Sequence, residues 1–187
     1  MPSSDQQMFL LLWFVLPVWL IAGFADWLCH RATHIETTAG IKETWIHLLM
    51  FLQMGIPMLS ALFLEVNALI IGFMIVLFFC HEATALWDVS YAVTARKVSP
   101  IEQHVHSFLE MVPLMALLLV ISRHWPQFLA LFGAGPESAR FDLHLRPDPL
   151  PVGYIASVLM VILLLEVLPY LEEYRRGKKA KGIAQGK

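Results

Sequence analysis

The chain has 187 residues, of which 58% are hydrophobic and 15% are charged, and its mean hydropathy is +0.64. Soluble domains carry about 25% charged residues, so this composition indicates a membrane protein without a separate soluble catalytic domain. The net charge of −2 leaves no basic face for a nucleic acid. Two cysteines cannot build a disulfide framework.

Five apolar segments are long enough to cross a membrane as helices. The first covers about residues 8–30 and lacks the cleavage site of a signal peptide. The others cover about residues 45–64, 68–90, 100–122 and 152–171. We therefore expect an all-α fold, a polytopic membrane helical bundle in which residues 1–187 form a single domain.

The connections between these segments complete the predicted organisation. Only a short turn near Glu65 separates the second and third spans, which predicts an antiparallel hairpin. Ser99-Pro100 is a helix-start signal for the fourth span. Residues 133–151 form the one sizeable loop, where the alternation at 141–145 is compatible with a short strand. The basic residues 175–187 are expected to form a mobile tail.

The distribution of lysine and arginine predicts the orientation. With five spans, ten of these residues fall on the side of the C-terminus and three on the other side. We expect an integral membrane protein, of the kind found in a bacterial inner membrane, with the N-terminus outside and the C-terminus in the cytoplasm. In that arrangement Arg96 is most simply a determinant of topology.

Six of the eight histidines lie at the predicted cytoplasmic ends of four spans, accompanied by carboxylates. Residues four apart share one face of a helix. Buried imidazoles and carboxylates are costly unless they pair or bind something. This pattern predicts a polar metal-binding chamber at the cytoplasmic end of the bundle, resembling bundle cores that hold two metal ions.

The residue types favour iron, with zinc or manganese as alternatives, and we expect two divalent ions. The predicted metal ligands are drawn from all four spans: His30, His34, Glu43, His47, His81, Asp88, Glu102, His106 and Glu110. Glu102 and Glu110 are also the predicted catalytic carboxylates. Asp26, Glu82 and His104 are expected to support ligands by hydrogen bonding, although His104 points away from His106 and is as well explained as an isolated histidine.

Other acidic residues are expected to serve the structure. Glu36 is as readily a capping residue as a ligand. Glu65 and Glu166 are expected to lie away from the chamber.

His30-Arg31-Ala32-Thr33-His34 matches the HxxxH box of the integral-membrane non-haem di-iron family, which includes fatty-acid hydroxylases and desaturases. The chain resembles that family also in its number of histidines and their predicted cytoplasmic position. It departs from the family because the later HxxHH boxes are absent. The resemblance implies a di-iron oxygenase and carries over only His30 and His34 as ligands.

The predicted function is a metal-dependent membrane oxidoreductase that acts on a lipid or other apolar substrate, with membrane lipids around it and an electron donor that the sequence does not identify. Alternatives are a di-zinc lipid hydrolase, a metal carrier or haem-binding membrane protein, and an accessory subunit of a larger complex. His81-Glu82 lacks the second histidine of an HExxH protease motif. The oligomeric state is left open.

Overall fold

A computed structural model gives the structure of residues 4–185, which is helical apart from its connecting loops and one isolated bridge. Five helical segments are long and apolar enough to cross a membrane, as the sequence predicts. They cover Asp5–Ala32, Ile41–Phe63, Ala68–Ala95, Pro100–Arg123 and Val152–Ile183. The fifth extends well beyond the predicted end at Leu171.

Two of the five segments are composite helices. The first joins α1 (Ser4–Leu10), the π-helical turn η1 (Leu11–Val15) and α2 (Leu16–Ala32), and the fifth joins α7 (Val152–Ile162), the π-helical turn η3 (Leu163–Val167) and α8 (Leu168–Gln185). The others are α3 (Ile41–Phe63), α4 (Ala68–Ala95) and α5 (Pro100–Arg123), with the short helices η2 (Ile35–Thr37) and α6 (Trp125–Leu131) between segments. Helix α6 was not predicted.

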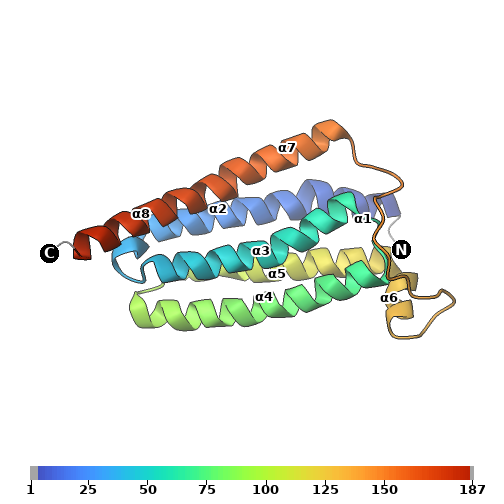
Figure 1. Ribbon diagram of the computed structural model, residues 1–187, viewed down its shortest axis with the longest axis horizontal. Helices are drawn as coiled ribbons and strands as arrows, with labels where there is room; N and C mark the ends of the chain where they lie inside the picture. Colours follow the sequence, from blue (N-terminus) through green and yellow to red (C-terminus); the bar gives the residue numbers. More distant parts are fainter. Residues whose placement is uncertain (1–3, 186–187) are drawn as a thin grey trace.

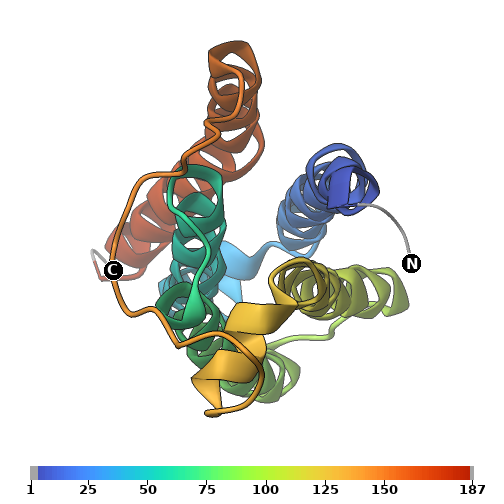
Figure 2. The same cartoon turned by 90° about the vertical axis from the view of Figure 1, so that its right-hand side faces the viewer.

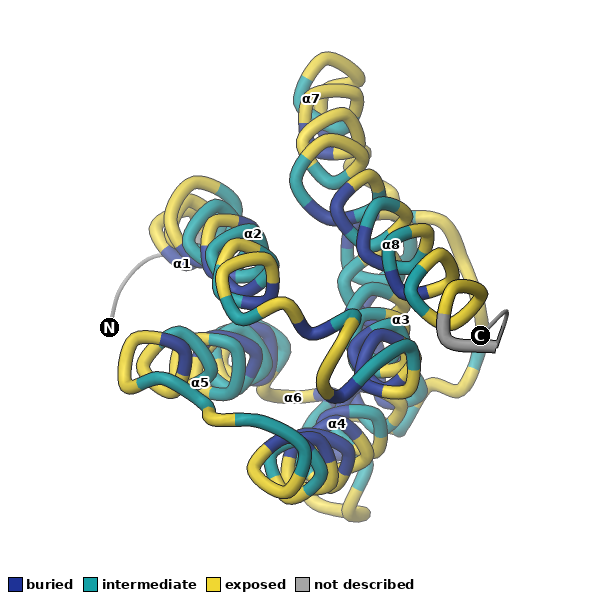
Figure 3. The backbone as a smooth tube through the Cα atoms, turned by 90° about the vertical axis from the view of Figure 1, so that its left-hand side faces the viewer, coloured by how far each residue is buried: buried dark blue, intermediate teal, exposed yellow. Residues whose placement is uncertain are grey.

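The long helices form a closed ring. Helix α3 packs on α4, α4 on α5, α5 on α2, and α2 on α8, which returns to α3. Figure 3 shows this ring from the end that carries the C-terminus, with buried residues turned toward the interior. The N- and C-termini lie at opposite ends of the bundle (Figure 1), as an odd number of spans requires.

Side-chain caps fix where two of the helices begin. The Asn67 side chain accepts a hydrogen bond from the backbone of Ile70 at 3.2 Å and starts α4, which only four residues separate from the end of α3. The Ser99 and Glu102 side chains form a reciprocal capping box that starts α5. Each cap contributes about 1 kcal/mol, and the tight α3–α4 connection confirms the predicted hairpin.

Two predictions about the connections are wrong. The basic residues from Arg175 onward continue α8 to Gln185, because Arg176 pairs with Glu36 and the chain at Gly177 packs on Ile41. Residues 186–187 lie outside the described part of the chain. Residues 141–145 contribute one bridge, from Leu145 to Leu64, and form no strand.

Candidate metal centre

Helices α2 and α5, which pack directly on each other, each present a carboxylate and a histidine one turn apart. Asp26 and His30 lie on α2, and Glu102 and His106 lie on α5. One ligand atom from each of the four side chains lies within 4.8 Å of the other three. The shortest contact joins His106 Nε2 to Asp26 Oδ1 at 2.9 Å. These four residues, the α2–α5 group, have the spacing of a metal-binding cluster.

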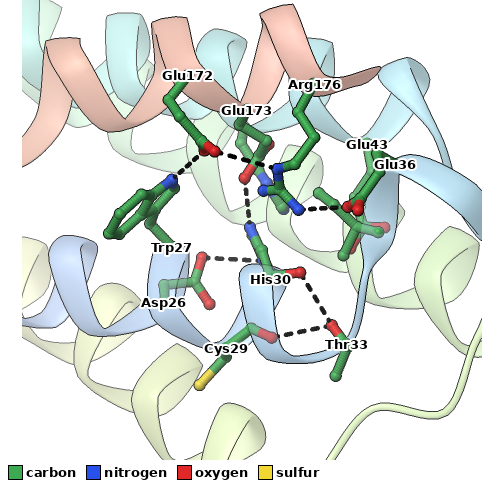
Figure 4. A network of polar contacts seen from close by, with 12 residues as sticks. Asp26, Trp27, Cys29, His30, Thr33, Glu36, Glu43, Glu172, Glu173 and Arg176 are labelled. Atoms are coloured by element: carbon green, nitrogen blue, oxygen red, sulfur yellow. Dashed lines mark hydrogen bonds and ion pairs between the residues drawn. The ribbon is translucent and has the colours of Figure 1, made fainter. Parts of the chain in front are cut away.

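His30 is oriented by a carboxylate from a third helix. Its Nδ1 lies 3.0 Å from Glu173 Oε2 of α8 (Figure 4). Because an ionised carboxylate only accepts hydrogen bonds, this contact places the ring proton on Nδ1. The other nitrogen, Nε2, is buried without a hydrogen bond among the described residues and faces Asp26 Oδ2 at 3.4 Å and Glu102 Oε1 at 3.8 Å. This is the carboxylate–histidine arrangement that orients ligands in metalloproteins.

A second group of possible ligands shares His30 with the first. His30, Glu43 and His47 each offer an atom within 4.8 Å of the others, and all three are buried. The rings of His30 and His47 stack with centroids 4.4 Å apart and planes 9° from parallel. On its other side, His47 Nε2 lies 3.0 Å from Asp88 Oδ2 of α4. The site therefore extends from the α2–α5 group toward α3 and α4.

Arg96 closes the end of the site nearest the loops. Its guanidinium contacts Glu43 Oε1 and Glu102 Oε1, both at 2.5 Å, and its side chain is 2% exposed. Burial lowers the pKa of Arg96, but the hydrogen bonds that Arg96 donates to Glu102 and Glu43 outweigh burial and raise that pKa above its ordinary value. Arg96 therefore remains charged and neutralises part of the cluster, a role beyond setting topology.

The site contains more buried negative groups than permanent positive ones. Six carboxylates in this half of the bundle are buried: Asp26, Glu43, Asp88, Glu102, Glu166 and Glu173. Among the described residues, Arg96 is the one arginine or lysine in contact with any two of them. Ionised carboxylates tolerate burial only when positive charge or protons compensate them. The histidines, bound cations or protons must supply the remainder.

An apolar cavity of about 80 Å³ borders this polar cluster. Asp26, His47, Asp88 and His106 of the cluster line it together with His81, Glu110 and Glu166, and the rest of the wall is mostly apolar. The apolar wall is formed by Trp19, Leu20, Met50, Phe51, Met58, Leu109 and Ile162. A small apolar group in this cavity would contact the cluster with little water present.

Three residues of the site were not assigned to it from the sequence: Arg96, Glu166 and Glu173. Glu166 was expected to lie away from the chamber, which is wrong: it lines the cavity, and its carboxylate approaches Gly23 of α2. Glu166, Tyr170 and Glu173 are spaced four and three residues apart, the spacing of one helix face. That pattern was available in the sequence, but the predicted end at Leu171 separated Glu173 from it.

His34 lies outside the cluster, so the predicted stripe of Asp26, His30 and His34 is wrong. Helix α2 ends at Ala32, and His34 adopts the left-handed conformation with φ of 51°. Its side chain is 74% exposed and lies 3.5 Å from the carboxylate of Glu36. The HxxxH spacing therefore does not bring its two histidines together.

The other predicted residues lie at different distances from the centre. His81 is buried, lines the cavity, and forms no hydrogen bond of normal geometry among the described residues. Glu110 lines the cavity farther along α5, whereas Glu82 neither lines the cavity nor belongs to either group of possible ligands. His104 is exposed and packs its ring edge on Phe108. Glu82 and His104 therefore do not support the ligands as predicted.

No family model, curated protein or solved structure matches this chain. The case for a function therefore depends on the buried cluster, which could hold metal ions, and on its surroundings.

Proposed function

We propose that this protein is a membrane-embedded metalloenzyme, an oxidoreductase whose cluster binds two divalent ions, with iron preferred, beside an apolar substrate. One observation carries the proposal: among the described residues, six buried carboxylates meet buried imidazoles, and a single arginine is there to offset them. Two divalent cations would remove most of that charge excess. Imidazole with carboxylate is a ligand set that suits iron.

The first ion would be held by the α2–α5 group: Asp26, His30, Glu102 and His106. The unpartnered Nε2 of His30 supports this assignment because it faces two carboxylates from inside the protein. Glu173 would orient His30 through Nδ1, and Arg96 would hold Glu102. Partners of this kind raise metal affinity by fixing ligand geometry.

The second ion would be held by Glu43 and His47, with Asp88 as a further carboxylate. His47 Nε2 and Asp88 Oδ2 lie 3.0 Å apart, close enough for an ion to be shared after a small side-chain movement. Since His30 Nε2 serves the first ion, the two sites would be adjacent and coupled through the stacked rings of His30 and His47. Two-ion centres inside helical bundles are assembled in this way.

The cavity supports an apolar substrate. Four residues of the cluster lie on one side of it and much of the remaining wall is apolar, so the protein would orient a hydrocarbon group against the ions and exclude water. Bound iron would supply the electron transfer needed to reduce O2. Glu110 lies on the cavity wall, outside both ligand groups, where it could hold or deliver a proton.

The same geometry counts against haem. Two axial histidines would have to face each other across the porphyrin with their nitrogens opposed. His30 and His47 instead stack in parallel at 4.4 Å, and three carboxylates lie within 3.4 Å of their nitrogens.

A spectroscopic experiment tests the redox function. Protein loaded with iron-57 is reduced without oxygen and then exposed to O2, and its Mössbauer spectrum is recorded before and after. We expect ferrous signals that convert to ferric ones. We expect this oxidation to be slower in Glu110→Gln than in the control Glu65→Gln, whose side chain lies at the opposite end of the bundle and does not line the small cavity. A protein that holds zinc tightly, rejects iron and does not respond to O2 contradicts the proposal and favours the lipid hydrolase.

A further inference from the structure

The half of the bundle opposite the metal centre encloses a second, larger cavity of about 440 Å³. Figure 2 views the bundle from that end, where α1, α3, α4 and α5 surround the centre and α6 and the loop after it cross below. Deep in the cavity the walls are apolar and come from Leu12, Leu16, Met58, Phe78 and Leu117. This volume is in the range of sites that bind small organic ligands.

The mouth of this cavity is polar, with arginines from α5 and from the loop that follows α6. Arg123, Arg140 and Arg146 line it together with His124. Arg140 forms an ion pair with Glu65, in which Arg140 Nη2 lies 2.5 Å from Glu65 Oε1. Arg146 instead donates to the backbone carbonyls of Ala61 and Asp148, each at 3.2 Å, and takes part in no ion pair among the described residues.

The groups around Arg146 carry charges of both signs. Burial, followed by the neighbouring Arg123, lowers the pKa of Arg146, and burial with the arginines lowers the pKa of His124 to about 4. His124 is therefore neutral at physiological pH, and Arg146 is a cation at the mouth that contacts backbone carbonyls and forms no ion pair among the described residues. The carboxylates of Glu137 and Asp148 also line the mouth, which disfavours a dianionic head such as a phosphate monoester.

The two cavities share part of their walls. Trp19 and Met58 line both the large cavity and the small cavity beside the metal centre. The hydrocarbon chain of a ligand whose polar head lies at Arg146 would thus extend toward His106 and Asp26. Its far end would lie at the shared wall.

We propose that the large cavity binds a single-chain amphiphile with a carboxylate head, a long-chain fatty acid in chemical class, with the head at Arg146 and the chain end at Trp19. The match is between an apolar cavity and a guanidinium at its mouth, Arg146, which forms no ion pair among the described residues and would pair well with a carboxylate. Binding does not require the metal. The further claim that this amphiphile is the oxidoreductase substrate rests on the proposed function.

Binding is tested with hexadecanoic acid brominated at its last carbon, because bromine quenches nearby tryptophan fluorescence. The metal-free protein in maltoside micelles should show saturable quenching, and Trp19→Phe should lose most of it. The same acid brominated next to the carboxylate should quench Trp19 much less. Stronger quenching by the head-brominated acid would overturn the orientation that we propose.

Matched variants test the head site and the cavity separately. Arg146→Gln should weaken binding by about tenfold or more, the effect of losing one charged hydrogen-bonding partner, whereas Arg175→Gln on the exposed face of α8 should not. Leu12→Trp places a larger side chain in the apolar part of the cavity and leaves the arginines at the mouth unchanged. It should abolish binding because the chain of the acid no longer fits. Hexadecanol that binds as well as the acid, or unchanged binding in folded Arg146→Gln and Leu12→Trp, overturns the proposal. A protein that binds the acid but never takes up metal would overturn the proposed enzyme function and leave the acid site standing.

Discussion

The two ends of the bundle use the same residue types in different ways. Near the C-terminus, Arg96, Glu43 and Glu102 form ion pairs whose side chains are at most 2% exposed. At the other end, Arg140 and Glu65 form a pair whose side chains are 44% and 28% exposed. A pair in water contributes little, whereas a buried pair must be complete to be tolerated. Burial of the charged side chains, and not their presence alone, distinguishes the candidate metal centre from an ordinary protein surface.

The largest expected difference between the two ends is in stability. Arg96→Ala leaves Glu43 and Glu102 buried without their cation and should destabilise the protein by about 3–5 kcal/mol. Arg140→Ala removes an exposed pair and should cost about 1 kcal/mol or less. Thermal unfolding in the same detergent measures both. Equal unfolding temperatures for the two variants would mean that the cluster around Arg96 is not buried as described.

Glu173 and its neighbour Glu172 offer a matched test of metal affinity. Glu173→Gln removes the carboxylate that holds His30 Nδ1 and should lower metal affinity by about 10–100-fold. Glu172→Gln changes a partly exposed residue that contacts Trp27, Arg31 and Arg176 and should leave affinity unchanged. Metal competition with a chromophoric chelator measures both. If the two variants bind metal equally, Glu173 does not position a ligand.

Two glycines on the wall of the small cavity provide a smaller test. A Cβ on Gly23 would lie 2.5 Å from Glu166 Oε1, whereas a Cβ on Gly55 meets no atom within 4 Å. Gly55→Ala should stabilise its helix by about 0.5–1 kcal/mol. Gly23→Ala should lose that gain because the Glu166 carboxylate must move away from the added methyl group. Identical stabilisation by both substitutions would place the Glu166 carboxylate elsewhere.

The smallest effect is expected at His34. Because this side chain is exposed beyond the end of α2, His34→Ala should bind metal like the unaltered protein, whereas His30→Ala should not. The HxxxH resemblance implies that both histidines are ligands. A loss of metal in His34→Ala equal to that in His30→Ala would support the resemblance and contradict the geometry.

Hydropathy and helical spacing predicted much of this molecule. The five spans, the α3–α4 hairpin and the gathering of Asp26, His30, Glu43, His47, Asp88, Glu102 and His106 at one end follow from local patterns of residues. Spacing could not reveal that α2 ends two residues before His34, because the left-handed turn there is set by the packing of the following loop. Nor could it show that Arg96 folds back onto Glu43, a contact between residues 53 positions apart.

The central claim is that the buried cluster binds metal, and elemental analysis of protein purified without added metal tests it most directly. We predict about two divalent ions per chain, as in other two-ion bundles, a sharp loss in His30→Ala, and no loss in His144→Ala, whose side chain is 65% exposed at the opposite end. A folded protein that holds no metal, even after incubation with ferrous or zinc salts, would contradict the account. The carboxylates of the cluster would then be balanced by protons and by Arg96 alone.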